Sequence, residues 1–338
     1  MLAGLNRASF FISKEHMEKI RIAYFGTPEF AASQLEAILN AGYEVAVVVT
    51  MPDKPAGRGR KIQYSDVKQT ALEHGLPLLQ PEKLKDPAFL EQLGSYQANL
   101  FIVVAFRMLP AVVWQMPELG TFNLHASLLP QYRGAAPINF AIINGETETG
   151  LTTFFLNEEI DKGAVIIREK VDIRPDETAG ELHDELMILG NKVVVETIKK
   201  IENGDFQALP QEELSDNQPL KPAPKITKEF CNIDWSSDCL TVYNHIRGLS
   251  PYPAAHTQLQ SDDGEIIDMK VYASEIESCI PNVVPGSVVT DHKKHLKIAL
   301  SDGFIHLKQV QQAGKKAMPI DDFLRGTQLN GSWKTTLK

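Results

Sequence analysis

The sequence has few cysteines, no long apolar run and no excess of positive charge. Its three cysteines, Cys231, Cys239 and Cys279, lack the Cys-x-x-Cys spacing of a zinc site, so neither a disulfide framework nor a bound metal is indicated. No stretch approaches the ~18 apolar residues of a membrane span. The formal net charge of −9 argues against indiscriminate coating of nucleic acid. We therefore expect a cytoplasmic protein with no metal and no membrane partner, and a monomer by default.

The length favours two domains, because one hydrophobic core rarely grows beyond about 250 to 300 residues and this chain has 338. Its 43% hydrophobic and 23% charged residues are typical of globular proteins. The first twenty residues place charges around a very short apolar patch, which is too short for a signal peptide. Residues 1–20 are therefore expected to be an N-terminal extension.

Strand and helix patterns alternate between residues 21 and 204. Arg21–Phe25 and Tyr43–Thr50 have the pattern of buried strands, and the helix between them has Thr27 as its expected N-cap. Asn99–Ala105 is apolar throughout, as in a parallel strand that is buried on both faces. This alternation predicts an α/β domain with a doubly wound, mostly parallel, Rossmann-like sheet.

A second domain is predicted after a linker. Residues 205–224 hold four prolines and few apolar anchors, which is the composition of a linker. In residues 225–338, short strand-like segments alternate with Gly, Asp and Asn turns, a pattern typical of a small β-barrel.

A basic segment, Met51–Lys61, interrupts the first domain. It carries Lys54, Arg58, Arg60 and Lys61 against a single acid, and its glycines and prolines disfavour regular structure, so we expect an irregular basic arm. Such an arm can lie against a phosphate backbone. A solvated loop is the equally weighted alternative.

The candidate chemistry begins at Asn123 and His125, which follow an apolar run. Side chains two residues apart on a strand share a face, and the chain then breaks into a loop at Pro130, where open α/β sheets bind their ligands. An amide can stabilise an oxyanion and an imidazole can pass a proton. Asp161, in a later turn, can orient the imidazole or collect a proton. Each residue alone is also an ordinary strand-end or turn residue, so only the combination indicates an active site.

The run Asn123–Pro137 (NLHASLLPQYRGAAP), followed by Ile160–Gly163, resembles the formyltetrahydrofolate-dependent formyltransferases. The resemblance implies that Asn123, His125 and Asp161 are catalytic and that 10-formyltetrahydrofolate is the co-substrate, with no metal. The residues implied to line the formyl-folate pocket are Ser127, Leu128, Leu129 and Pro130. One departure, Phe106-Arg107 in place of Tyr-Gly, affects the details of folate contact.

Three further segments, Gly26–Phe30, Pro52–Gly59 and Gln312–Met318, resemble the branch of that family that formylates the methionine of initiator Met-tRNA. This resemblance implies that the C-terminal domain is an OB-like barrel that helps to hold the tRNA. The basic residues expected to contact the tRNA are Arg58, Arg60, Lys61, Lys315 and Lys316.

Two other kinds of function stay open. A formyltransferase acting on a sugar nucleotide or a small ribonucleotide amine would need neither the basic arm nor a second domain. A non-catalytic RNA-binding module would need only the barrel and the arm. An assay of formyl transfer to Met-tRNA separates a catalyst from a module.

The basic arm generates a first prediction. Arg58→Ala should weaken tRNA-dependent activity and lower its sensitivity to salt, because one phosphate contact would be lost. The measurement is the KM for Met-tRNA at low and at high salt. Kinetics identical to those of the unchanged protein at both salt concentrations would contradict a tRNA contact.

Overall fold

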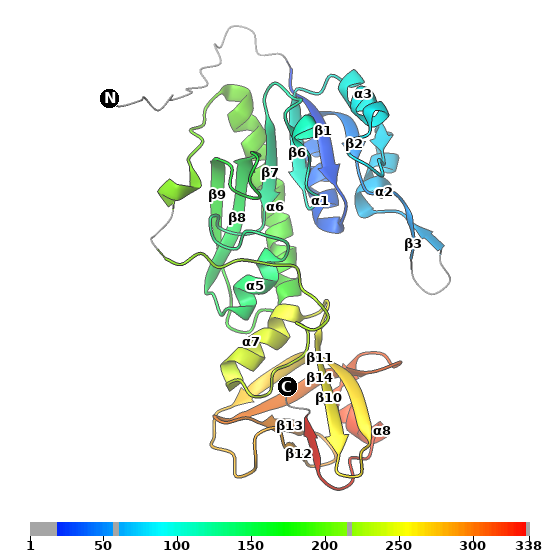
Figure 1. The fold of residues 1–338 in the computed structure, drawn as a ribbon, viewed down its shortest axis with the longest axis vertical. Coiled ribbons are helices and arrows are strands. Elements are labelled where there is room, and N and C mark those ends of the chain that lie inside the picture. The colour runs from blue at the N-terminus through cyan, green and yellow to red at the C-terminus, as the bar shows by residue number, and fades with distance from the viewer. Residues whose placement is uncertain (1–18, 57–60, 215–217, 336–338) are drawn as a thin grey trace. The chain divides into compact units, whose positions relative to one another are not determined.

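The computed structural model describes residues 19–56, 61–214 and 218–335 (Figure 1). Residues 1–18 of the predicted extension lie outside this range. The chain forms two compact units, one made of residues 1–125, 151–169 and 187–217, and the other of residues 126–150, 170–186 and 218–338. The second unit therefore takes up two short segments of the predicted first domain. The predicted domain boundaries stay a prediction.

The first sheet has seven strands and is mostly parallel, as predicted. The strands β5, β2, β1, β6 and β7 pair in parallel, and β8 pairs antiparallel with β7. In sheet order the strands are β5 (Leu78–Leu79), β2 (Glu44–Val49), β1 (Arg21–Gly26), β6 (Leu100–Val104), β7 (Thr121–His125), β8 (Glu148–Phe155) and β9 (Val165–Asp172).

Local sequence explains where the helices beside this sheet begin. Ser65 accepts a hydrogen bond from the backbone of Lys68 at the start of α2, and Asp86 caps α3 in the same way. The predicted cap of α1 was wrong, because Pro28 is its N-cap residue and makes no side-chain cap. The helices are α1 (Glu29–Asn40), α2 (Asp66–Glu73), α3 (Pro87–Ser95), α4 (Ala111–Trp114) and α6 (Ala179–Asn203).

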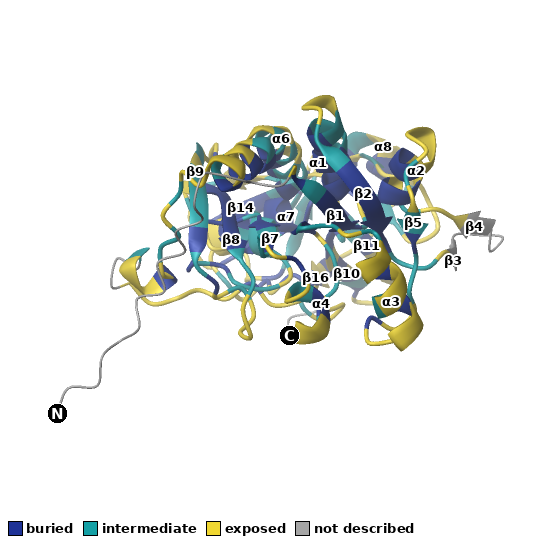
Figure 2. Cartoon of the chain, turned by 90° about the horizontal axis from the view of Figure 1, so that it is seen from above, coloured by how far each residue is buried: buried dark blue, intermediate teal, exposed yellow. Residues whose placement is uncertain are grey.

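The central strands form the core of this sheet. Residues of β1 and β2 are almost all buried (Figure 2), and all residues of β6 are buried. Phe25 and Phe101 pack with ring centroids 5.3 Å apart, and aromatic pairs at this separation add to the stability that burial supplies. No helix among the described residues has the length and apolar character needed to cross a membrane.

The described residues on either side of 57–60 in the basic arm form two short strands, so the prediction that the arm has no regular structure was wrong. Strands β3 (Lys54–Ala56) and β4 (Lys61–Gln63) pair antiparallel. Both are edge strands of a two-stranded sheet, where a proline such as Pro55 is tolerated. Next to this hairpin, Lys68 donates to Asp53 at 2.5 Å and to Gln80 at 2.9 Å. These hydrogen bonds, with Lys68 as the larger cause, lower the pKa of Asp53. Arg58 and Arg60 lie outside the described residues.

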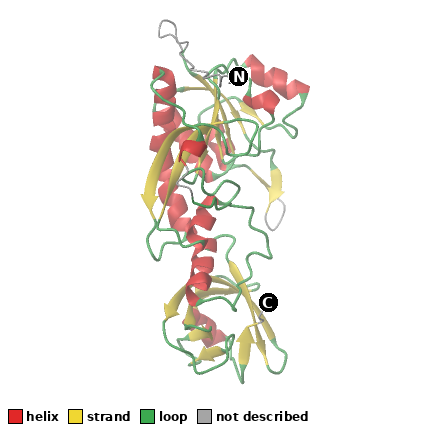
Figure 3. Cartoon of the chain, turned by 60° about the vertical axis from the view of Figure 1, so that its left-hand side comes forward, coloured by secondary structure: helices red, strands yellow, loops and turns green. Residues whose placement is uncertain are grey.

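The second sheet is antiparallel and closes into a barrel, which confirms the predicted barrel (Figure 3). Ser287, just before β12, forms a bridge with Lys334 in the last strand, and Thr335 N donates to Gly286 O at 2.8 Å. In order the strands are β12 (Val288–Thr290), β13 (Leu296–Ala299), β14 (Phe304–Gln312), β11 (Ile266–Glu277), β10 (Ala255–Ser261) and β16 (Trp333–Thr335), and β15 (Met318–Pro319) pairs with β14. Helix α8 (Ile320–Gly326) follows β15.

Helix α7 (Cys239–Leu249) precedes the barrel and packs tightly against α5 (Pro137–Ile143). Asn139 of α5 donates to the carbonyl oxygen of Gly248 at 2.7 Å. A Cβ atom on Gly248 would lie 2.5 Å from a side-chain carbon of Ile143. The close approach of the two helices therefore requires glycine at position 248.

Gly248→Ala should lower the free energy of unfolding by about 1–3 kcal/mol, the usual cost of overpacking. Gly326→Ala is the matched control, because a Cβ there meets no atom within 4 Å. Urea unfolding of both variants measures the difference. Equal stabilities would show that α5 and α7 are less tightly packed than described.

Candidate active site

Strand β7 carries Asn123 and His125 and is paired on both sides. Val103 of β6 lies opposite Asn123, and on the other side Thr152 of β8 lies opposite His125. His125 is 7% exposed, and Asn123 is partly exposed. The side-chain amide of Asn123 makes no hydrogen bond to any residue that the structure describes. The two-residue spacing on a fixed strand gives both side chains the same face.

The segment after His125 is the site loop, residues 126–136. Ser127 is fully buried, and its hydroxyl donates to the carbonyl oxygen of Gln131 at 2.7 Å. This hydrogen bond closes the turn, so the Ser127 side chain shapes the loop. The three residues that follow it, Leu128, Leu129 and Pro130, are also buried.

Asp161 lies in the turn between β8 and β9. Its φ is 52°, a conformation that non-glycine residues adopt rarely and that aspartate tolerates better than most. A Cβ on Gly163 would lie 1.6 Å from the carbonyl oxygen of Phe155, so glycine lets the turn fold back against the end of β8.

The strand register places this turn near the beginning of β7, since Phe122 lies opposite Phe155. His125 lies at the other end of β7. Asn123 and His125 are thus brought together by one strand, and their convergence with Asp161 stays a prediction. In the described part of the chain, no group of three or more His, Cys, Asp and Glu side chains has the arrangement of a metal site.

Sequence reasoning missed Gln211, which holds the turn of Asp161. Gln211 begins the 3-10 helix η1 (Gln211–Leu214), within the predicted linker, and is fully buried. Its side-chain amide donates to the carbonyl oxygens of Asp161 and Gly163, both at 2.9 Å. A glutamine directly after Pro210 was the only local signal, and it does not reveal a partner fifty residues away.

Arg107, at the predicted departure from the family pattern, joins two loops. Its guanidinium donates to the carbonyl oxygens of Pro81 and Glu82, the latter at 2.8 Å. Burial lowers its pKa from the ordinary value. Phe106 packs on Phe25 with ring centroids 5.9 Å apart. The charge that the sequence adds here is therefore bound by backbone carbonyls.

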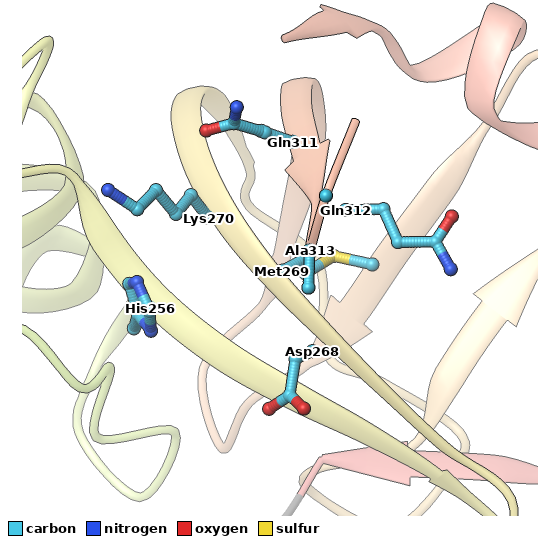
Figure 4. Close-up of a pocket in the computed structure, with 8 residues that line it drawn as sticks. His256, Asp268, Met269, Lys270, Gln311, Gln312 and Ala313 are labelled. Carbon is cyan, nitrogen blue, oxygen red and sulfur yellow. The ribbon is translucent and has the colours of Figure 1, made fainter. Parts of the chain in front are cut away.

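Three of the five predicted tRNA contacts, Lys61, Lys315 and Lys316, lie among the described residues. Lys61 belongs to strand β4. Lys315 and Lys316 are exposed in the turn after β14, where the side-chain amide of Gln311 donates to the Lys315 carbonyl at 2.7 Å. This turn borders a hollow of about 210 Å³ (Figure 4). Its polar lining residues are His256, Asp268, Lys270, Gln311 and Gln312.

Both parts of the chain match known families. A model of the formyl transferase family matches residues 18–198, and a model of the formyl transferase C-terminal domain matches residues 225–328.

Relatives are similar over nearly the whole chain. The methionyl-tRNA formyltransferase of Bacteroides thetaiotaomicron is 56% identical over 94% of this chain and 98% of its own length. The enzyme of the same name from Bacteroides fragilis is 54% identical over the same shares.

Among solved structures, a sugar 3N-formyl transferase, WlaRD, crystallised with dTDP and 5-N-formyl-THF, is similar with a TM-score of 0.62. It is 19% identical and covers 89% of this chain and 100% of its own. At this identity the likeness concerns the fold.

The role of Gln211 can be tested. Gln211→Met keeps the bulk of the side chain but leaves two carbonyl oxygens without their donor, which costs ~1–3 kcal/mol per buried group. We expect kcat to fall about tenfold, because a turn that is held less firmly leaves Asp161 less often in its reactive position and each 1.36 kcal/mol added to the barrier lowers a rate tenfold, while KM values change little. An unchanged kcat in a folded variant would contradict a link between Gln211 and the position of Asp161.

Proposed function

The chain belongs to the formyl transferase family, and on this premise we propose that it transfers the formyl group of 10-formyltetrahydrofolate to the amino group of methionine on initiator Met-tRNA. The observation that carries the proposal is the identity of more than half of the residues with methionyl-tRNA formyltransferases over almost their whole lengths. The likeness to a sugar formyl transferase rests on 19% identity and lends no comparable support to a sugar nucleotide.

The reaction makes one bond and breaks one. The methionine amine attacks the formyl carbon, the carbonyl oxygen takes the negative charge, and the bond to the folate nitrogen then breaks. One proton leaves the attacking nitrogen and one reaches the departing nitrogen. The protein must therefore stabilise an oxyanion and move protons.

Asn123 is proposed to donate its amide hydrogen to the developing oxyanion. This type of donor is worth about 10²–10³ in rate in other enzymes. The absence of a partner for this amide among the described residues supports the assignment, because no existing hydrogen bond has to break. His125 is proposed to donate to the same oxygen or to pass the proton to the departing nitrogen.

Asp161 is proposed to hold His125 in the required protonation state, or to collect the amine proton through a water molecule. Its backbone is fixed by Gln211 on one side of the turn, which supports a positional role. The carboxylate would then already be in position before the reaction begins. Holding a catalytic group in position in advance lowers the activation barrier.

Formyl-folate is proposed to bind beside the site loop, against residues 127–130. Because the Ser127 hydroxyl is already bonded to Gln131, these residues would contribute the shape of the loop and its backbone groups. Apolar walls with few polar groups are typical of small-molecule sites.

The tRNA is proposed to contact the basic residues of the arm and of the barrel, chiefly Arg58, Arg60 and Lys61, with Lys315 and Lys316. Phosphate contacts of this kind fix the position of a nucleic acid and do not read its sequence. A cytoplasmic monomer fits this proposal, and Cys231, Cys239 and Cys279 are free thiols.

Formyl transfer from 10-formyltetrahydrofolate to Met-tRNA tests the function directly. Charged initiator tRNA should be formylated much faster than the charged elongator. Binding of tRNA without turnover would instead favour an RNA-binding module.

Asp161→Asn should reduce turnover by ~10²–10⁴, the usual contribution of a positioned acid or base, and should leave the Kd for Met-tRNA nearly unchanged. Single-turnover rates and tRNA binding, measured on the same preparation, check this. A parallel loss of binding would mean that Asp161 has a structural role.

A further inference from the structure

The predicted linker contains a segment that is bound along the site loop. We call Pro219–Ala223 the strap. Gly134 and Ala223 form a parallel bridge, and the Gln131 side chain accepts from Lys221 N at 2.8 Å and donates to Pro219 O at 3.3 Å. Backbone hydrogen bonds join the two segments as well. Tyr132 N donates to Lys221 O at 2.7 Å, and Ala223 N donates to Arg133 O at 2.9 Å. The carbonyl oxygen of Ala223 accepts from Ala135 N at 2.7 Å and from Ala136 N at 3.2 Å.

The alternation of residues in the strap explains these bonds. Lys221 and Ala223 each direct a backbone N–H to the site loop. Pro222, between them, and Pro224, after them, have no N–H, so neither adds a donor that would need a partner on the other side. The composition that is typical of a linker therefore also suits a strand bound along one edge.

Gly134 makes this contact possible. Its φ is 127°, and a Cβ atom at this position would lie 2.3 Å from the carbonyl oxygen of Ala223. Any side chain at position 134 would push the strap away from the loop. Ala223 is fully buried and packs with Tyr132 and Phe140 in a small apolar cluster.

Side chains fasten the strap as well. Lys221 Nζ donates to Glu146 Oε1 at 2.6 Å, and the hydroxyl of Tyr132 donates to the same carboxylate oxygen. Asn144 in turn donates to the Tyr132 hydroxyl at 3.2 Å. Tyr132 is 4% exposed, and burial, with a smaller effect of Glu146, raises its pKa. The ammonium group of Lys221 in the strap thus binds the Glu146 carboxylate, which also accepts the hydrogen bond of the buried Tyr132 hydroxyl in the site loop.

We propose that the strap is a positioning element for the site loop, and that Lys221, through Glu146 and Tyr132, fixes the loop in the conformation that binds the formyl donor. Lys221 acts through other residues and does not touch the substrate. This proposal rests on the proposed function, because it assigns the loop to the formyl donor. It also gives the linker a role beyond connecting two domains.

The test uses the full chain and four variants of Lys221 and its partner Glu146. Lys221→Met removes the charge and keeps most of the apolar stem, so the fold should survive. We expect the KM for 10-formyltetrahydrofolate to rise about fivefold, the effect of losing one net hydrogen bond, with an unchanged KM for Met-tRNA. Lys221→Arg should restore the donor KM, because it restores the charged donor.

Coupling can be measured with a double mutant. Glu146→Gln should raise the donor KM, and Lys221→Met with Glu146→Gln should be no worse than the more severe single variant, because both changes break one network. Lys170→Met is the matched control, since it breaks a Lys–Glu pair of 2.8 Å, between Lys170 and Glu148, both of which lie outside the site loop in sequence. This control should have the kinetics of the unchanged protein.

Several outcomes would overturn the proposal. A donor KM unchanged in Lys221→Met would do so, as would an equal change in Lys170→Met. A rise in the KM for Met-tRNA alone would make Lys221 a tRNA contact. Absence of formyl transfer by the unchanged protein would instead refute the proposed function, so the two failures can be told apart.

Discussion

The pairing of β7 between β6 and β8 is the constraint on which the rest of the site depends. Parallel pairing on one side and antiparallel pairing on the other fix the backbone at both edges, so Asn123 and His125 cannot turn to opposite faces. The chain must then leave the sheet in a loop without regular structure. Every buried backbone polar group of such a loop needs a partner, and a segment about ninety residues away supplies several of these partners.

This arrangement relates the composition of the chain to its chemistry. Glycine stands at position 134 because another backbone passes close by, and at 163 because the turn of Asp161 folds against β8. The prolines of the strap are tolerated because alternate residues make its hydrogen bonds. Gln211 and Lys221 come from the same stretch, and each serves a different functional segment, the turn of Asp161 and the site loop.

Much of the fold could be predicted because it depends on local sequence patterns. The apolar run of Asn99–Ala105 indicated a buried parallel strand, and the short barrel strands could be recognised from the turn residues between them. Asn123 and His125 could be paired by spacing alone. The hydrogen bonds of the strap could not, because their partners lie far apart in sequence. The hairpin of β3 and β4 was missed because the proline and glycine content of Met51–Lys61 disfavours regular structure, and the pairing of the two strands is visible only in the structure.

The most direct test of this account is a crystal structure of the protein with its formyl donor bound. We predict that the position the oxyanion takes when this formyl carbon becomes tetrahedral lies about 2.7–3.1 Å from the side-chain amide nitrogen of Asn123, with His125 and Asp161 on the same side of the formyl carbon. A formyl group bound elsewhere, with an apolar wall between the imidazole and the carboxylate, would contradict it.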